Sequence, residues 1–228
     1  MFFFLLLSRK RYKETACAVC LVVAANVSAM LWLGRSLASA AAFLKQGADE
    51  IVRTYYLLYR LDEIPFDHSL FSIVKQVLRI LRGWNAPQPL NIKGAYPIYV
   101  VGSALLLLWA GWFFWGKPVL NKLFAVVILM LVVPPVSYDY TLVHVYSVWG
   151  LFAIAISRDG VPPKVTHFLA AFAILMTPQS YLNWKSIAVA GQFKALVLVY
   201  LFYLACTVRL PSSLFGEPIP QRLRVAVS

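Results

Sequence analysis

The chain has few charged residues and very few acidic ones. Of its 228 residues 13% are charged, with 9 Asp and Glu against 21 Lys and Arg. Soluble domains are about 25% charged. Together with 61% hydrophobic residues and a mean hydropathy of +0.73, this shortage excludes an ordinary soluble enzyme and a disordered chain. The excess of positive charge indicates contacts with membrane lipids, not nucleic acid. We therefore predict a polytopic membrane protein.

Cysteine is scarce as well, and the usual cofactor motifs are missing. Cys17 and Cys20 form a C-x-x-C, normally a redox or metal signal, but they lie inside an apolar run. We interpret them as packing residues and expect no metal. The chain contains no glycine-rich phosphate loop, no H-E-x-x-H and no G-x-S-x-G. No cofactor is expected.

Long apolar runs predict an all-α fold, a transmembrane helix bundle. A spanning helix needs about 20 mostly apolar residues. Runs of about this kind number six, and the third and fifth are short. Prolines follow the third run and flank the fifth. Because proline ends helices, we expect helix breaks at these places. The runs are Thr15–Gly34, Tyr96–Trp115, Val119–Val133, Thr141–Ser157, Val165–Thr177 and Ser186–Cys206.

The distribution of Lys and Arg predicts the orientation. Segments on one side of the predicted membrane hold eleven of them, against one in the two short loops on the other side. Basic segments stay in the cytoplasm, so both termini are expected there. The expected organisation is a cytoplasmic stub (1–14), the bundle (15–206) with a long outer loop (35–95), and a cytoplasmic tail (207–228).

The first seven residues, Met1–Leu7, are apolar but too few to span a bilayer at about 1.5 Å per residue. We expect them to end a helix that begins before this chain; the alternative is an interfacial anchor.

The outer loop holds an amphipathic segment, Ser69–Arg82. Lys75, Arg79 and Arg82 recur on one face, and apolar residues form a stripe on another. Such a helix lies on the membrane surface with its apolar side down and its cations level with lipid phosphates. The alternative is a helix packed on the bundle with solvated cations.

Just before this helix, Asp67 or Ser69 is a candidate helix cap. The helix amides, His68 and nearby Lys75 together make a candidate phosphate site. The plainer interpretation of His68 is a capping or packing residue.

A second polar constellation follows Pro134–Pro135, at Ser137, Tyr138 and Asp139. Asp139 is either a helix cap or a group that hydrogen-bonds a sugar hydroxyl or orients a base. His144 follows one turn later and is expected to line the same cavity. We predict that His68 and Asp139 share one outward-facing cavity. Lys194, within the last helix, either pairs with an anionic group in the bundle or extends outward to the interface.

The segments FDHSLFSIVKQVLRIL and PPVSYDYTLVHVY carry a family resemblance. Together with the helix order, they resemble the C-terminal half of glycosyltransferase family 87, also called domain of unknown function 2029. These are integral membrane enzymes of the C-type superfamily. His68, Ser69 and Leu70 match an N-H-S-L motif, with Asp67 in place of asparagine. Positions of the later turn match P-x-S-x-D-[HY]-x-L: Pro135, Ser137, Asp139, Tyr140 and Leu142.

The resemblance implies transfer of a sugar such as mannose or arabinose from a polyprenyl-phosphate donor to a lipid or glycan acceptor. It also implies a bacterial-type plasma membrane. The family's acidic base has no match in this chain, so the catalytic residue is unknown. The alternative function is a non-catalytic component of an envelope polysaccharide pathway, either a transporter fragment or a lipid-binding or assembly subunit. The candidate substrate-binding residues are His68, Ser69, Lys75, Arg79, Ser137, Tyr138, Asp139 and His144.

Overall fold

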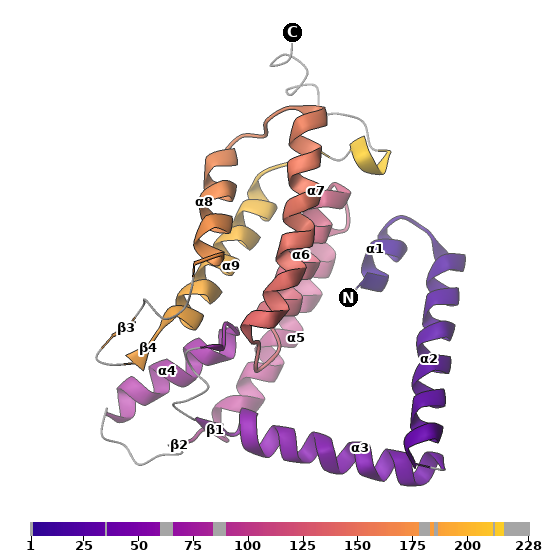
Figure 1. Ribbon diagram of the computed structural model, residues 1–228, viewed down its shortest axis with the longest axis vertical. Helices are drawn as coiled ribbons and strands as arrows, with labels where there is room; N and C mark the ends of the chain where they lie inside the picture. Colours follow the sequence, from indigo (N-terminus) through magenta and orange to yellow (C-terminus); the bar gives the residue numbers. More distant parts are fainter. Residues whose placement is uncertain are drawn as a thin grey trace.

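The computed structural model shows an all-α helical membrane bundle (Figure 1). It describes residues 2–34, 36–59, 66–83, 90–177, 183–184, 187–211 and 213–216. The α-helices are α1 (Phe2–Ser8), α2 (Tyr12–Gly34), α3 (Leu37–Ile51), α4 (Leu70–Arg82), α5 (Ala95–Phe114), α6 (Val119–Val132), α7 (Val143–Asp159), α8 (Val165–Leu175) and α9 (Ala190–Thr207).

Short elements connect these helices. A π-helical turn, η1 (Val52–Tyr56), follows α3. A 3-10 turn, η3 (Asp139–Leu142), precedes α7, and another, η5 (Ser213–Phe215), follows α9. Two antiparallel pairs of two-residue strands complete the described part: β1 (Leu58–Tyr59) with β2 (Leu90–Asn91), and β3 (Asn183–Trp184) with β4 (Ile187–Ala188).

Each of the six predicted runs contains a helix. Within the described part of the chain, four helical segments are long and apolar enough to cross a membrane: Tyr12–Trp32, Ala95–Phe114, Tyr140–Asp159 and Ala190–Thr207. The other two, α6 and α8, are shorter, as the sequence indicated. The last helix begins at Ala190 and not at Ser186, because Ile187–Ala188 form strand β4 instead.

The core is built around α6, whose side chains are buried on nearly every face. A helix that is apolar all round is stable only when other helices surround it, and α6 contacts α5, α7, α9 and α1. Phe124 at its centre lies 5.7 Å, ring to ring, from both Phe152 of α7 and Phe168 of α8. Edge-on aromatic packing of this kind fixes the relative rotation of the three helices.

Proline and glycine end the helices where the sequence predicted breaks. Pro134–Pro135 follow the end of α6 at Val132. α7 ends before Gly160, whose φ of 91° is a left-handed conformation that favours glycine. Because α6 ends at Val132 and α7 begins at Val143, the η3 turn lies between these two helices.

Polar side chains tie the C-terminal segment to the end of the bundle. Asn121 of α6 is fully buried, donates to the carbonyls of Ala205 and Val208, and accepts from the amide of Leu210. Buried Asp159 accepts from Ser213 through both carboxylate oxygens. The described residues that follow α9 are therefore part of the fold.

Helices α2 and α3 form an arm at the side of the bundle. In Figure 1, α2 stands apart from α5–α9 and α3 runs crosswise at the end away from the C-terminus. Only 6% of the apolar window in α2 is buried. Cys17 and Cys20 are exposed, free thiols on α2, so their interpretation as packing residues is wrong for the described chain.

The three hydrogen bonds that join Asn121 to the chain around the end of α9 lead to a stability prediction. Asn121→Leu removes three hydrogen bonds and leaves buried backbone groups without partners. We expect the free energy of unfolding to fall by about 2–4 kcal/mol, measured by thermal unfolding in detergent. Asn26→Leu, on the exposed face of α2, is the matched control and is expected to change it by less than about 0.5 kcal/mol. An equal fall in the free energy of unfolding in the two variants would contradict the stabilising role of the Asn121 hydrogen bonds.

Candidate functional site

Two polar segments that are far apart in sequence meet at the end of the bundle away from the C-terminus (Figure 1). One is the stretch before α4, residues 66–69, and the other is the turn from Ser137 to Thr141. Their backbones pair: Asp67 and Tyr138 form a β-bridge, and the amide of His68 donates to the carbonyl of Ser137 at 2.8 Å. The two constellations expected from the sequence therefore lie together.

Asp67 holds this junction. Its carboxylate is 2% exposed, and one oxygen accepts from the amides of Ser69 at 2.9 Å and Ser137 at 3.0 Å. The other oxygen lies 3.9 Å from Lys75 Nζ. Ser69, not Asp67, caps α4, because its hydroxyl accepts from the amide of Ser72 at 3.0 Å.

His68 is fully buried in a network of hydroxyl groups. Its Nε2 lies 3.0 Å from Ser137 Oγ and 3.2 Å from Thr141 Oγ1. The Thr141 hydroxyl donates to the carbonyl of Tyr138 at 2.7 Å, so its oxygen is left to accept. This network fixes the imidazole ring against the turn. Sequence reasoning missed Thr141; its spacing of four from Ser137 at the start of a helix was the available signal.

The remaining predicted residues of the turn are placed differently. Tyr138 is half-buried, with its ring 6.2 Å from that of Tyr140. The backbone of Asp139 begins η3, and its side chain lies outside the described residues. His144 is exposed on α7 and lies outside the cluster. Its expected place in the cavity is wrong, because Val145 and Val148 present the buried face of α7.

Helix α4 packs on the bundle, as the alternative interpretation held, but Lys75 and Arg79 are buried and not solvated. Lys75 is 3% and Arg79 5% exposed, whereas Val77 is 48% and Leu81 76% exposed. Lys75 and Arg79 therefore point inward together with Phe71, whereas Val77, Ile80 and Leu81 point outward. Buried cations require compensating partners, and Lys75 Nζ donates to the carbonyl of Tyr55 at 2.9 Å. In a membrane an outward apolar face meets lipid at no cost.

Helix α9 packs against α4 and adds two further buried polar side chains. Gln192 Nε2 donates to the carbonyl of Asp67 at 3.4 Å. Lys194 is 5% exposed, so of our two interpretations the extension to the interface is wrong. Among the residues that the structure describes, no group of His, Cys, Asp and Glu has the arrangement of a metal site.

A groove of about 600 Å³ opens beside this cluster, between α5 and α6. Pro134 and Pro135 line it, and the carbonyl of Pro135 accepts from Ser69 Oγ at 3.2 Å. Tyr99 also lines it, with its ring 4.6 Å from that of Phe71 on α4. Two residues of the groove wall, Pro135 and Tyr99, therefore contact Ser69 and Phe71 at the start of α4.

Tyrosines form the polar end of this groove. The rings of Tyr56 and Tyr96 stack at 5.5 Å, and the Tyr99 hydroxyl donates to the carbonyl of Val133 at 2.8 Å. Burial, with a smaller contribution from Tyr96, raises the pKa of the Tyr56 hydroxyl. Tyr56 thus stays a neutral hydrogen-bond donor at physiological pH.

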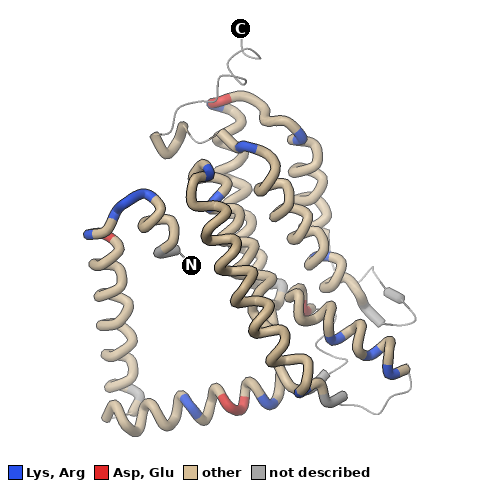
Figure 2. The backbone as a smooth tube through the Cα atoms, turned by 180° about the vertical axis from the view of Figure 1, so that it is seen from behind, with Lys and Arg blue, Asp and Glu red and all other residues tan. Residues whose placement is uncertain are grey.

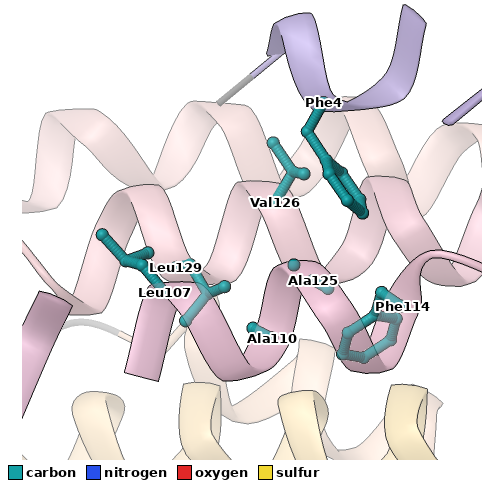
Figure 3. Close-up of a pocket in the computed structure, with 8 residues that line it drawn as sticks. Phe4, Leu107, Ala110, Phe114, Ala125, Val126 and Leu129 are labelled. Carbon is teal, nitrogen blue, oxygen red and sulfur yellow. The ribbon is translucent and has the colours of Figure 1, made fainter. Parts of the chain in front are cut away.

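The groove continues along the helices as an apolar cavity of about 150 Å³ (Figure 3). Leu107 and Leu129 line both cavities, and Phe4 of α1 and Phe114 line the far part. From Tyr96 to Phe114 the helix axis runs about 27 Å at 1.5 Å per residue. Apolar residues therefore line this side of α5 over a length comparable to the hydrocarbon core of a bilayer.

The Asp67 junction gives a second prediction. Asp67→Ala leaves two buried backbone amides without their acceptor and removes the carboxylate near buried Lys75, and we expect the free energy of unfolding to fall by about 3–5 kcal/mol. The measurement is thermal unfolding in detergent. Asp49→Ala, at an exposed position on α3, is the control and should have little effect. A tolerated Asp67→Ala would show that the junction does not depend on this carboxylate.

Comparison with protein-family models, with curated proteins and with solved structures finds no match for this chain. The resemblance to glycosyltransferase family 87 therefore rests on the motif residues alone.

Proposed function

We propose that this protein binds a polyprenyl-phosphate-linked sugar at the polar end of its bundle, as part of a membrane glycosyltransferase. The sugar, such as mannose or arabinose, would pass to a lipid or glycan acceptor at the outer face. One observation carries the proposal: a helix with inward cations stands beside a long apolar groove. A phosphate attached to an isoprenoid chain has the matching chemistry.

The cations supply the phosphate part of this argument. Lys75 and Arg79 are buried on one face of α4, and His68 lies immediately before that helix. As a sugar leaves its polyprenyl phosphate, negative charge builds up on the phosphate oxygens. Cations already fixed in a site of low dielectric stabilise that charge without reorganising.

The groove supplies the lipid part. Its lining between α5 and α6 is almost wholly apolar beyond the tyrosines. A soluble nucleotide sugar would gain nothing from such a surface, whereas a hydrocarbon chain is stabilised in proportion to the apolar area it covers.

The alternative function is binding without transfer, and one observation favours it. Asp67 accepts two amide hydrogen bonds and lies beside Lys75, so it does not serve as a base. Among the side chains described at this cluster, no second carboxylate is present. A non-catalytic subunit of an envelope polysaccharide pathway would need the cations and the groove but no base.

Transfer from a polyprenyl-phosphate donor tests the proposal. In membranes that contain the full chain, Arg79→Gln is expected to lower the transfer rate about tenfold or more, because a charge-assisted hydrogen bond contributes about 1.5–3 kcal/mol. His68→Ala and Asp139→Asn are expected to lower it as well. Arg82→Gln, at the exposed end of the same helix, is the matched control.

Thermal unfolding of each variant separates loss of fold from loss of function. A folded Arg79→Gln protein with unchanged transfer would remove the phosphate role. Donor binding without any transfer in the unmodified protein would establish the alternative function.

We further propose that both termini lie in the cytoplasm of a bacterial-type plasma membrane. Figure 2 shows Lys and Arg at the α1–α2 turn and at the helix ends near the C-terminus, and also along α3 and α4 at the other end. Short basic segments determine orientation more strongly than long loops. The Lys and Arg of the α1–α2 turn and of the helix ends near the C-terminus therefore determine which side faces the cytoplasm in this proposal.

Labelling of introduced cysteines tests this orientation, with the native cysteines replaced by serine. Tyr140 is 76% exposed beside the site, and Lys164 is exposed at the other end of the bundle. We expect a membrane-impermeant maleimide to label Tyr140→Cys in intact cells and Lys164→Cys only after permeabilisation. The reverse pattern would place the site in the cytoplasm.

A further inference from the structure

A second polar cluster lies where α8 begins beside the C-terminal half of α9, far from α4 (Figure 1). His167 Nδ1 is 2.5 Å from the hydroxyl of Tyr200. The Tyr200 and Tyr203 rings stack at 6.3 Å, and Lys164 Nζ lies 5.8 Å from the centroid of the Tyr203 ring. All four side chains are exposed, and they come from two helices that pack together.

The His167–Tyr200 contact leaves a donor for a ligand whichever way its proton points. If the tyrosine hydroxyl donates to Nδ1, the neutral imidazole carries its proton on Nε2, which is then a donor. If Nδ1 donates to the tyrosine oxygen, the phenolic O–H is the remaining donor. With the Lys164 ammonium, the cluster therefore offers at least two donors to an anion.

The electrostatic surroundings also favour an anion. Helices α8 and α9 contain no Asp or Glu. Lys164 precedes the first turn of α8, where the helix dipole contributes positive potential. A lysine and tyrosines at the end of apolar helices are typical of the level of the lipid headgroups.

Directly beneath the cluster lies an apolar groove of about 240 Å³ between α8 and α9. His167 and Tyr200 form its polar end, and Ile174 and Leu196 line its deeper part. The groove exists because Ala170 and Ala171 of α8 present only methyl groups to α9. A polar cluster at one end of an apolar groove fits an amphiphile whose headgroup contacts the cluster and whose hydrocarbon chain lies in the groove.

We propose that this surface binds an anionic glycerophospholipid of the leaflet nearest the termini. Its phosphate would contact Lys164, His167 and Tyr200, and one acyl chain would lie in the groove against Ala170. The charge of the cluster selects an anionic headgroup, and the groove selects a lipid over a free anion. This site is independent of the polyprenyl-phosphate site, and its test uses no sugar donor.

The test is binding of phosphatidylglycerol and of phosphatidylcholine to the purified full chain in detergent, followed by native mass spectrometry and thermal unfolding. We expect phosphatidylglycerol to bind about tenfold more tightly. Lys164→Gln and Tyr200→Phe are each expected to reduce this preference several-fold, because they remove a donor at the lipid surface. Tyr146→Phe, on α7, is the matched control for the hydroxyl.

The groove has its own pair of variants. Ala170→Leu fills the groove and is expected to weaken binding of phosphatidylglycerol, whereas Ala173→Leu, exposed one turn away on the same helix, is not. Equal binding of the two lipids in every variant would show non-specific annular lipid and overturn the proposal. The proposal that an acyl chain lies in the groove would be overturned by either of two results. One is that inorganic phosphate alone stabilises the protein against thermal unfolding as much as phosphatidylglycerol does, and the other is that Ala170→Leu has no effect on binding.

Discussion

The site depends on one buried carboxylate. Asp67 lies between two segments about 70 residues apart and accepts an amide from each. In the low dielectric of the bundle an uncompensated carboxylate would cost several kcal/mol, so both amides and the nearby Lys75 ammonium must be present together. That requirement fixes the residues before α4 against the α6–α7 turn. It also fixes the start of α4 and therefore the direction in which every later residue of that helix points.

The inward polar face of α4 follows from this arrangement. Once Lys75 is held near Asp67 and the carbonyl of Tyr55, Arg79 lies on the same face one turn later, and Val77 and Leu81 must point outward. In water such an arrangement would leave apolar side chains in contact with solvent, whereas next to lipid they contact hydrocarbon. The result is that Lys75 and Arg79 lie inside the protein, on a helix whose Phe71 contacts Tyr99 at the wall of the apolar groove.

The two ends of the bundle use polar groups differently. At the end near the C-terminus, Asn121 and Asp159 are fully occupied with backbone groups and serve the fold. At the other end, Lys75, Arg79 and Lys194 are buried, and Lys75 donates to the carbonyl of Tyr55 and lies near Asp67. Buried charged side chains are common at functional sites, and the proposed donor site lies at this end.

The sequence by itself determined the membrane class, a helix within each of the six apolar runs and the proline-bounded breaks between them. Length, hydropathy and proline act locally, so one segment suffices to predict them. It also marked His68, Ser69 and Ser137 as polar residues at helix starts. Only the tertiary structure decided that these segments meet, that Thr141 joins them, that His144 does not, and that α4 turns its cations inward. An amphipathic pattern shows that a helix has two faces but not which one the bundle covers, because that depends on partners distant in sequence, here Asp67 and the carbonyl of Tyr55.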